Sequence, residues 1–104
     1  PVEPTPETDP SWFGFPMYAN ERLDREKIVS ALEDRKVGTR LFFAGNLIKQ
    51  PAYKNENFRV HGELKNTDNV MRSLFWIGVH PALDTKKMNY MLEQLEAVCK
   101  VAVK

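Results

Sequence analysis

The chain has 104 residues, of which 42% are hydrophobic and 28% charged, with a formal net charge of +1. Length and composition predict one ordinary globular domain with a modest core. The near balance of charge argues against nucleic acid as a partner, because phosphate backbones bind to a basic face. No apolar run approaches the roughly 20 residues needed to span a bilayer, and no signal-peptide pattern is present. We therefore expect no membrane association.

Cysteine usage points to a reducing compartment. Cys99 is the only cysteine, so neither an internal disulfide nor a thiolate cluster can form within the chain. It lies between Val98 and Val101 in an expected helix, and a reactive thiol needs an electropositive, accessible setting. We predict a small core residue and a cytoplasmic protein.

The N-terminal residues 1–10 read as a linker. They contain four prolines and three acidic residues, a composition that favours extended, solvated backbone. The chain also lacks an initiating methionine. We expect a folded domain over 11–104 that is the C-terminal piece of a longer protein.

The first half of the expected domain alternates a strand and a helix. Residues 11–18 are rich in aromatics and predict a strand, and Pro16 favours an edge position. Asp24 is a good N-cap for a helix with an apolar stripe, and Gly38 is the expected C-terminal stop.

The run 39–53 has no clean helical or strand period. A brief strand over 41–43, a turn at 45–46 and a helical turn opened by Pro51 are expected. Residues 54–63 are polar and irregular, which predicts an exposed loop.

The second half again combines helices with a strand. The capping residues of 66–68 predict the start of a short helix, and the continuous apolar run 74–79 predicts a buried strand covered on both faces. Asp84 caps a last helix whose methionines, Met88 and Met91, are expected to fill the core. These elements predict an α+β layer with a small sheet covered mainly on one side.

The chain offers no set of residues for catalysis. No acid pair, metal-ligand spacing or nucleophile motif is present, so we expect neither a catalytic residue nor a metal site, and the isolated domain is not a credible enzyme. His61 lies in a polar loop. His80 follows a buried strand, where either a ligand contact or a structural role fits.

The run 39–50 is the best candidate for a binding site, because it mixes apolar bulk with hydrogen-bonding groups as a ligand-lining loop does. Arg40 can fork onto phosphates or carboxylates, although pairing with Glu33 or Asp34 on the surface is the alternative. Asn46 suits sugar hydroxyls but equally suits a plain turn, and Gln50 is a weaker candidate. A polar, ring-shaped ligand fits these residue types.

Several separated motifs resemble one enzyme group. They are Ser11-Trp12-Phe13-Gly14-Phe15-Pro16, Val37 to Leu47, Gln50-Pro51-Ala52-Tyr53, Leu64 with Asn66-Thr67-Asp68, and Trp76 to Pro81. In this order they resemble the C-terminal part of the CDP-4-dehydro-6-deoxyglucose 3-dehydratases of lipopolysaccharide biosynthesis. That group belongs to the pyridoxal-phosphate sugar aminotransferase and dehydratase superfamily.

The resemblance implies the small C-terminal domain of a fold-type-I pyridoxal-phosphate enzyme, with a short, mostly antiparallel sheet. The implied parent uses pyridoxal or pyridoxamine phosphate and an iron–sulfur cluster held by four cysteines. This equipment is expected in a large N-terminal domain, so the fragment itself is expected to bind no cofactor and to be inactive alone. His80 is not expected to be the catalytic histidine of the family.

By the same resemblance, the small domain contributes a loop over the nucleotide-sugar. In this sequence the substrate-binding residues would be Thr39, Arg40, Phe42, Phe43, Asn46 and Gln50. The implied partners are the chain's own large domain, the nucleotide-sugar substrate, a reductase and a second copy in a homodimer. Surface that packs on the large domain, including Phe42, Phe43 and Tyr53, is expected to form an exposed apolar patch. A sugar aminotransferase parent and a free-standing interaction module are the alternatives.

Overall fold

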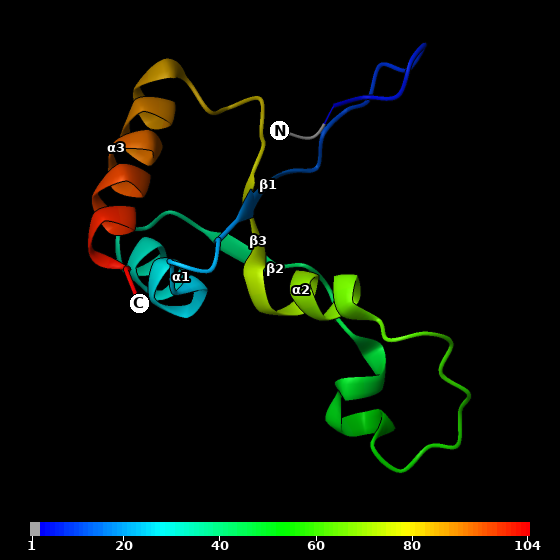
Figure 1. Cartoon of the computed structure of the whole chain (residues 1–104). Coiled ribbons are helices and arrows are strands. Elements are labelled where there is room, and N and C mark those ends of the chain that lie inside the picture. Colours follow the sequence, from blue (N-terminus) through cyan, green and yellow to red (C-terminus); the bar gives the residue numbers. More distant parts are fainter. Residues whose placement is uncertain (1–2) are drawn as a thin grey trace.

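The computed structural model describes residues 3–104, which form a small sheet with helices on one side (Figure 1). The antiparallel sheet contains β1 (Gly14–Tyr18), β3 (Leu74–Gly78) and β2 (Thr39–Leu41), in that spatial order. The helices of the described part are α1 (Arg25–Asp34), α2 (Lys65–Ser73) and α3 (Thr85–Val101), with short 3-10 helices η1 (Leu47–Lys49) and η2 (Pro51–Tyr53). The predicted α+β class is confirmed, and Pro16 lies on an edge strand as expected.

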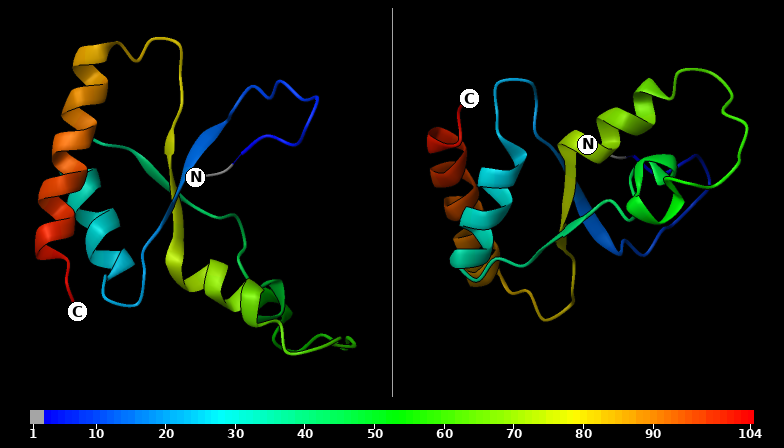
Figure 2. Two further views of the ribbon diagram at one scale, coloured as in Figure 1. Left: turned by 45° about the horizontal axis from the view of Figure 1, so that its top comes forward. Right: turned by 90° about the horizontal axis from the view of Figure 1, so that it is seen from below.

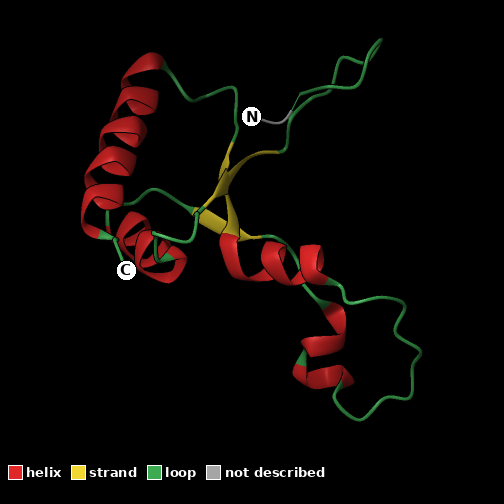
Figure 3. Cartoon of the chain, in the orientation of Figure 1, coloured by secondary structure: helices red, strands yellow, loops and turns green. Residues whose placement is uncertain are grey.

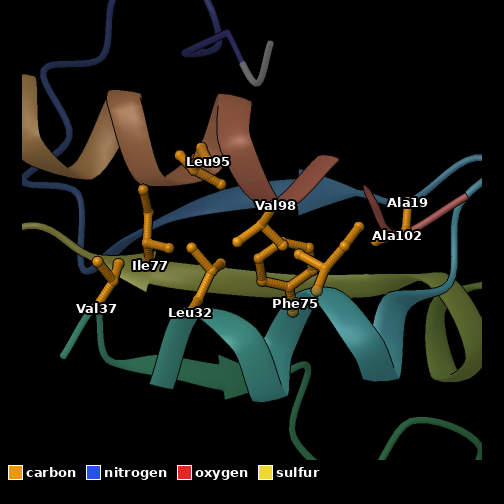
Figure 4. Close-up of a cluster of buried hydrophobic side chains, with 9 residues drawn as sticks. Ala19, Leu32, Val37, Phe75, Ile77, Leu95, Val98 and Ala102 are labelled. Carbon is orange, nitrogen blue, oxygen red and sulfur yellow. The ribbon is translucent and has the colours of Figure 1, made fainter. Parts of the chain in front are cut away.

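Helices α1 and α3 lie side by side on one face of the sheet (Figure 2). Alternation along the central strand β3 turns Phe75 and Ile77 toward these helices, and both are buried. Figure 4 shows them among side chains of α1 and α3. The buried apolar core consists of Ala19, Ile28, Leu32, Val37, Phe75, Ile77, Leu95, Val98 and Ala102. Full burial of a Leu or Val side chain contributes about 1.5–3 kcal/mol, so this cluster holds the sheet and two helices together.

Helix α3 is only half covered. Its buried side chains, Leu95 and Val98, lie toward its C-terminal end, and Cys99 packs against the core as predicted. Met91 is partly buried, but Met88 is 46% exposed because the first turns of α3 extend past the layer of α1 and the sheet. The expectation of core packing is therefore right for Met91 and wrong for Met88.

The end of α1 differs from the expectation. Asp24 caps its start as predicted, since its Oδ1 accepts hydrogen bonds from two backbone amides of the first turn. The helix ends four residues before Gly38. Lys36 takes the left-handed conformation at φ 63°, and the amide of Val37 donates to the carbonyl of Leu32. This is a Schellman motif with lysine where glycine is usual, so Gly38 is not the stop.

The start of α2 is also corrected. The helix begins at Lys65, and Leu64 is its N-cap at φ 52° with no side-chain cap. Residues 66–68 therefore lie inside the first turn, and Asp68 is bound to groups outside the helix. At the start of α3, by contrast, the side chain of Asp84 accepts from the amide of Lys87 as predicted.

Strand β3 is covered by helices on one face only, which corrects the expectation of cover on both. Its other face presents Trp76, whose ring centroid lies 4.9 Å from that of Phe13, the residue before β1. A side chain at Gly14 would lie 2.2 Å from the indole, so glycine lets the ring rest on the β1 backbone. The strand was expected from residue 11 and begins at Gly14.

Residues 42–64 form an arm that projects away from α1 and α3 (Figure 3). Residues 51–63 are all exposed, which confirms the predicted loop over 54–63, and η2 opens at Pro51 as predicted. The radius of gyration is 16.2 Å, against about 13 Å for a compact domain of this size. Among the described residues, no helix combines the length and apolarity needed to cross a membrane. In the predicted linker, residues 3–10 lack regular structure and residues 1–2 lie outside the described range.

Candidate functional site

Strand β2 places Arg40 on the uncovered face of the sheet. Arg40 pairs with Trp76 of β3, which in turn pairs with Pro16 of β1, so the three residues share that face. The guanidinium is exposed, and its Nη1 donates to the carbonyl of Thr39 at 2.7 Å. A hollow of 260 Å³ opens beside it, lined by Gly38, Thr39, Arg40, Trp76 and Gly78. A cation and an indole therefore line one site on this face.

Thr39 is held by α1 rather than turned outward. It is 5% exposed, and its amide and hydroxyl donate to Oε1 of Glu33 at 2.5 and 2.7 Å. The backbone bond from Thr39, then its hydroxyl bond, hold the pKa of Glu33 below its usual range, and the nearby Arg40 charge acts in the same direction. Glu33 thus fixes the start of β2. This occupies the polar groups of Thr39 within the chain.

Phe42 and Phe43 follow the end of β2 and do not line that hollow. The strand was expected over 41–43 but ends at Leu41, and Phe43 takes a left-handed backbone at φ 47°. Phe43 is 84% exposed, and its ring meets that of Phe42 edge-on. A bulky residue in this conformation carries strain, which is found most often at functional sites. Of the three residues expected in an apolar patch, Phe43 and Tyr53 are exposed, whereas Phe42 is partly buried.

A second hollow, of 120 Å³, lies between this turn, α1 and α2. It is lined by Arg25, Leu41, Phe42, Phe43, Ala44, Gly45, Gln50 and Met71. The Gln50 amide donates to the carbonyl of Ala44, which closes the turn. Gly45 has φ 59°, and a side chain there would lie 2.6 Å from Met71, so the turn rests directly on α2. The floor of this hollow is therefore fixed.

Asn46 is the base of the arm. It is 2% exposed, and its Nδ2 donates to Oδ1 of Asp68 at 2.7 Å. Lys49 binds the other carboxylate oxygen, also at 2.7 Å. The Lys49 bond, followed by the Asn46 bond, lowers the pKa of Asp68 below its usual range. The amide nitrogen of Asn46 is thus engaged in joining the arm to α2.

A larger cleft of 810 Å³ adjoins the Arg40 hollow, since Gly38 and Gly78 line both. Lys36, His80, Lys86 and Lys87 are among its lining residues. His80 is exposed, and its Nδ1 accepts from the amide of Ala82, so it takes part in a turn. His61 is also exposed, in the arm.

The structure divides the six predicted residues among three places. Thr39 and Arg40 line one hollow, Phe42, Phe43 and Gln50 line another, and Asn46 lies buried between them and α2. Sequence reasoning missed Trp76 and Arg25 as site-lining residues. The clue for Trp76 was its position between Phe75 and Ile77, because alternate residues of a strand face opposite sides of the sheet. Arg25 carried no signal beyond following the N-cap.

Comparison with known proteins identifies the family. The sequence model of the DegT/DnrJ/EryC1/StrS aminotransferase family matches residues 1–96. The lipopolysaccharide biosynthesis protein RfbH of Salmonella typhimurium LT2 is 48% identical over 96 residues, covering 90% of this chain and 22% of that protein. The dTDP-4-dehydro-2,6-dideoxy-D-glucose 3-dehydratase of Saccharopolyspora spinosa is 39% identical over 93 residues, covering 88% and 20%. The chain thus spans about a fifth of the length of these relatives. It belongs to the DegT/DnrJ/EryC1/StrS aminotransferase family.

Proposed function

We propose that this chain is the small C-terminal domain of a nucleotide-sugar 3-dehydratase of deoxysugar and lipopolysaccharide biosynthesis, and that residues 39–50 cover its substrate. The observation that carries the proposal is that Arg40 and Phe43 are both exposed and line two separate hollows. Among the described residues, the side chain of Arg40 hydrogen-bonds only to the carbonyl of its neighbour, and Phe43 is 84% exposed on a strained turn. The names of the two relatives, one a lipopolysaccharide biosynthesis protein and one a sugar 3-dehydratase, support the same substrate class.

Each residue has a role that its geometry supports. Arg40 donates to a phosphate or hydroxyl of the substrate, since its guanidinium lies at the mouth of the 260 Å³ hollow. Phe43 covers the sugar and excludes water. Thr39, Asn46 and Gln50 act by holding the loop, because their polar groups bond to Glu33, Asp68 and Ala44.

The cofactors belong to another part of the protein in this proposal. Pyridoxal or pyridoxamine phosphate supplies an electron sink for carbanion chemistry when it is bound. An iron–sulfur cluster is usually held by four cysteines, and this chain has one. Nor does any group of three or more metal-ligating side chains occur within residues 3–104. These residues therefore do not fit the cluster. We assign the iron–sulfur cluster and the pyridoxal or pyridoxamine phosphate to a large N-terminal domain in the cytoplasm.

The uncovered sheet face is the proposed contact with that domain. It presents Trp76, Leu74 and Pro16, which are only partly buried, together with the exposed Tyr18. An apolar sheet face is stable when another layer covers it. The reductase and the homodimer partner remain proposals without a surface assigned to them.

The test is an assay of the complete gene product with CDP-4-dehydro-6-deoxyglucose and its dTDP counterpart. A dehydratase releases the 3-hydroxyl as water, whereas an aminotransferase needs an amino donor and yields an amino sugar. Arg40→Ala should lower kcat/KM by about 10- to 100-fold, the worth of one hydrogen bond to a charged group. Arg59→Ala, an exposed arginine on the arm, is the matched control and should have no effect. Equal activity of the two variants would remove Arg40 from the site.

A further inference from the structure

Arg25 is the most poorly satisfied charged group in the described part of the chain. Its side chain is 14% exposed, and its Nε is buried with no hydrogen-bond partner among residues 3–104. The nearest carboxylate, that of Glu26, lies 3.8 Å from Nη2 and is itself 87% exposed. A largely buried cation facing a solvated anion gains little from the pair. Because Nε is closed to solvent, a further acceptor would stabilise this cation by bonding to the terminal nitrogens of the guanidinium.

The position of Arg25 shows which group can supply that acceptor. Arg25 lines the 120 Å³ hollow together with Phe42, Phe43 and Gln50 of the predicted site. This volume equals that of about four water molecules, so it suits a small anionic group rather than a sugar ring or a base. A guanidinium fork matches the oxygens of phosphate in two parallel hydrogen bonds.

The walls of the hollow favour the same kind of ligand. Met71 and Gly45 form a tightly packed floor, because any side chain at Gly45 would collide with Met71. The side chains of Phe42 and Leu41 add apolar wall, which lowers the local dielectric and strengthens a charge pair. Phe43, held in a left-handed turn, stands exposed at the edge.

We propose that Arg25 is a phosphate-binding residue of this site and takes the diphosphate of a nucleoside diphosphate sugar. The inference rests on the proposed function for the identity of the ligand. It divides the site in two: Arg25 holds the diphosphate in the 120 Å³ hollow, while Arg40 lines the separate 260 Å³ hollow. The affinity for the diphosphate should then depend on Arg25 more than on any exposed arginine.

The experiment measures binding to the complete gene product by calorimetry, with CDP, dTDP, cytidine and thymidine as probes. Arg25→Gln should weaken the nucleoside diphosphate that the wild type binds by about 10- to 100-fold. It should leave the matching phosphate-free nucleoside unchanged. Arg25→Lys keeps the charge but loses the fork, so an intermediate loss is expected. Arg22→Gln is the matched control, because Arg22 is exposed and precedes the same helix.

Thermal unfolding separates binding from folding. A purely structural Arg25 would lower Tm when replaced and weaken nucleoside and nucleoside diphosphate alike, which would overturn the inference. Wild-type affinity in Arg25→Gln, with binding still weakened by Arg40→Ala, would overturn it and leave the proposed function standing. If neither arginine affects binding or turnover, both proposals fail.

Discussion

The helix–sheet half of the molecule (the sheet with α1 and α3) and the arm (residues 42–64) are held by different forces. In the helix–sheet half, Leu32 and Val98 are fully buried within a continuous apolar cluster. In the arm, the one buried residue is the polar Asn46, which joins the turn to Asp68 of α2. A packed core resists local opening, whereas a segment held by a few polar bonds opens at low cost. The residues proposed to meet the substrate come from both regions: Arg25 and Arg40 lie on α1 and β2 of the helix–sheet half, whereas Phe43 lies in the arm, where the chain can adjust.

The largest expected effect comes from removing a side chain from the apolar core, which tests whether this core holds the helix–sheet half together. Leu32→Ala should destabilise the chain by about 2–5 kcal/mol, since it leaves a cavity beneath β3. Leu92→Ala, on the exposed side of α3 at 59% exposure, should cost about 0.5 kcal/mol or less. Urea denaturation followed by tryptophan fluorescence measures both. Equal costs would mean that the cluster does not hold this half together.

The next test separates the arm from the core. Asn46→Ala removes the buried bond to Asp68 and should speed amide exchange in η1 and in the first turn of α2 about tenfold. Exchange in α1 and α3 should stay close to the wild-type rate, because the lost hydrogen bond joins the arm to α2. Asn57→Ala, an exposed residue of the same arm, is the control. Faster exchange throughout the molecule would show that the arm and the core open together.

Acid should loosen the two anchors of the loop. The folded-state pKa values of Glu33 and Asp68 are both lowered, so each carboxylate stabilises the fold above its ordinary pKa of about 4. That contribution is lost as pH falls through the lowered folded values. Asp68→Asn should flatten the acid dependence of exchange in the arm, and Glu33→Gln that of the β2 junction. If amide exchange in both variants depends on pH between 5 and 2 as it does in the wild type, then Glu33 and Asp68 do not hold the loop in place.

The same division explains what the sequence could predict. The helices and β3 follow from apolar periodicity and from the caps Asp24 and Asp84, so their order and class were predictable. The one-sided cover of β3 was not, since a continuous apolar run does not reveal that Trp76 rests on Gly14. In the site, residue types indicated a binding loop, but burial of Asn46 against Asp68 depends on a contact across 22 positions. Arg25 was missed for the same reason, because its Nε is buried without a hydrogen-bond partner only in the folded structure, where the turn packs on α2.

The smallest expected effect is the change in stability when backbone strain is relieved. One strained residue in each region can be tested. Lys36 closes the Schellman turn after α1 at φ 63°, and Phe43 turns the arm at φ 47°. Lys36→Gly relieves the left-handed cost and should raise stability by about 0.5–1 kcal/mol, with substrate affinity unchanged. Phe43→Gly relieves similar strain but removes the exposed ring, so affinity should fall while the urea midpoint stays or rises. If the strain at a residue can be removed without loss of affinity, that residue serves only the fold. If removing the strain lowers the affinity, the residue takes part in binding the ligand. If both variants bind as the wild type does, the strain at Phe43 is no more functional than that at Lys36.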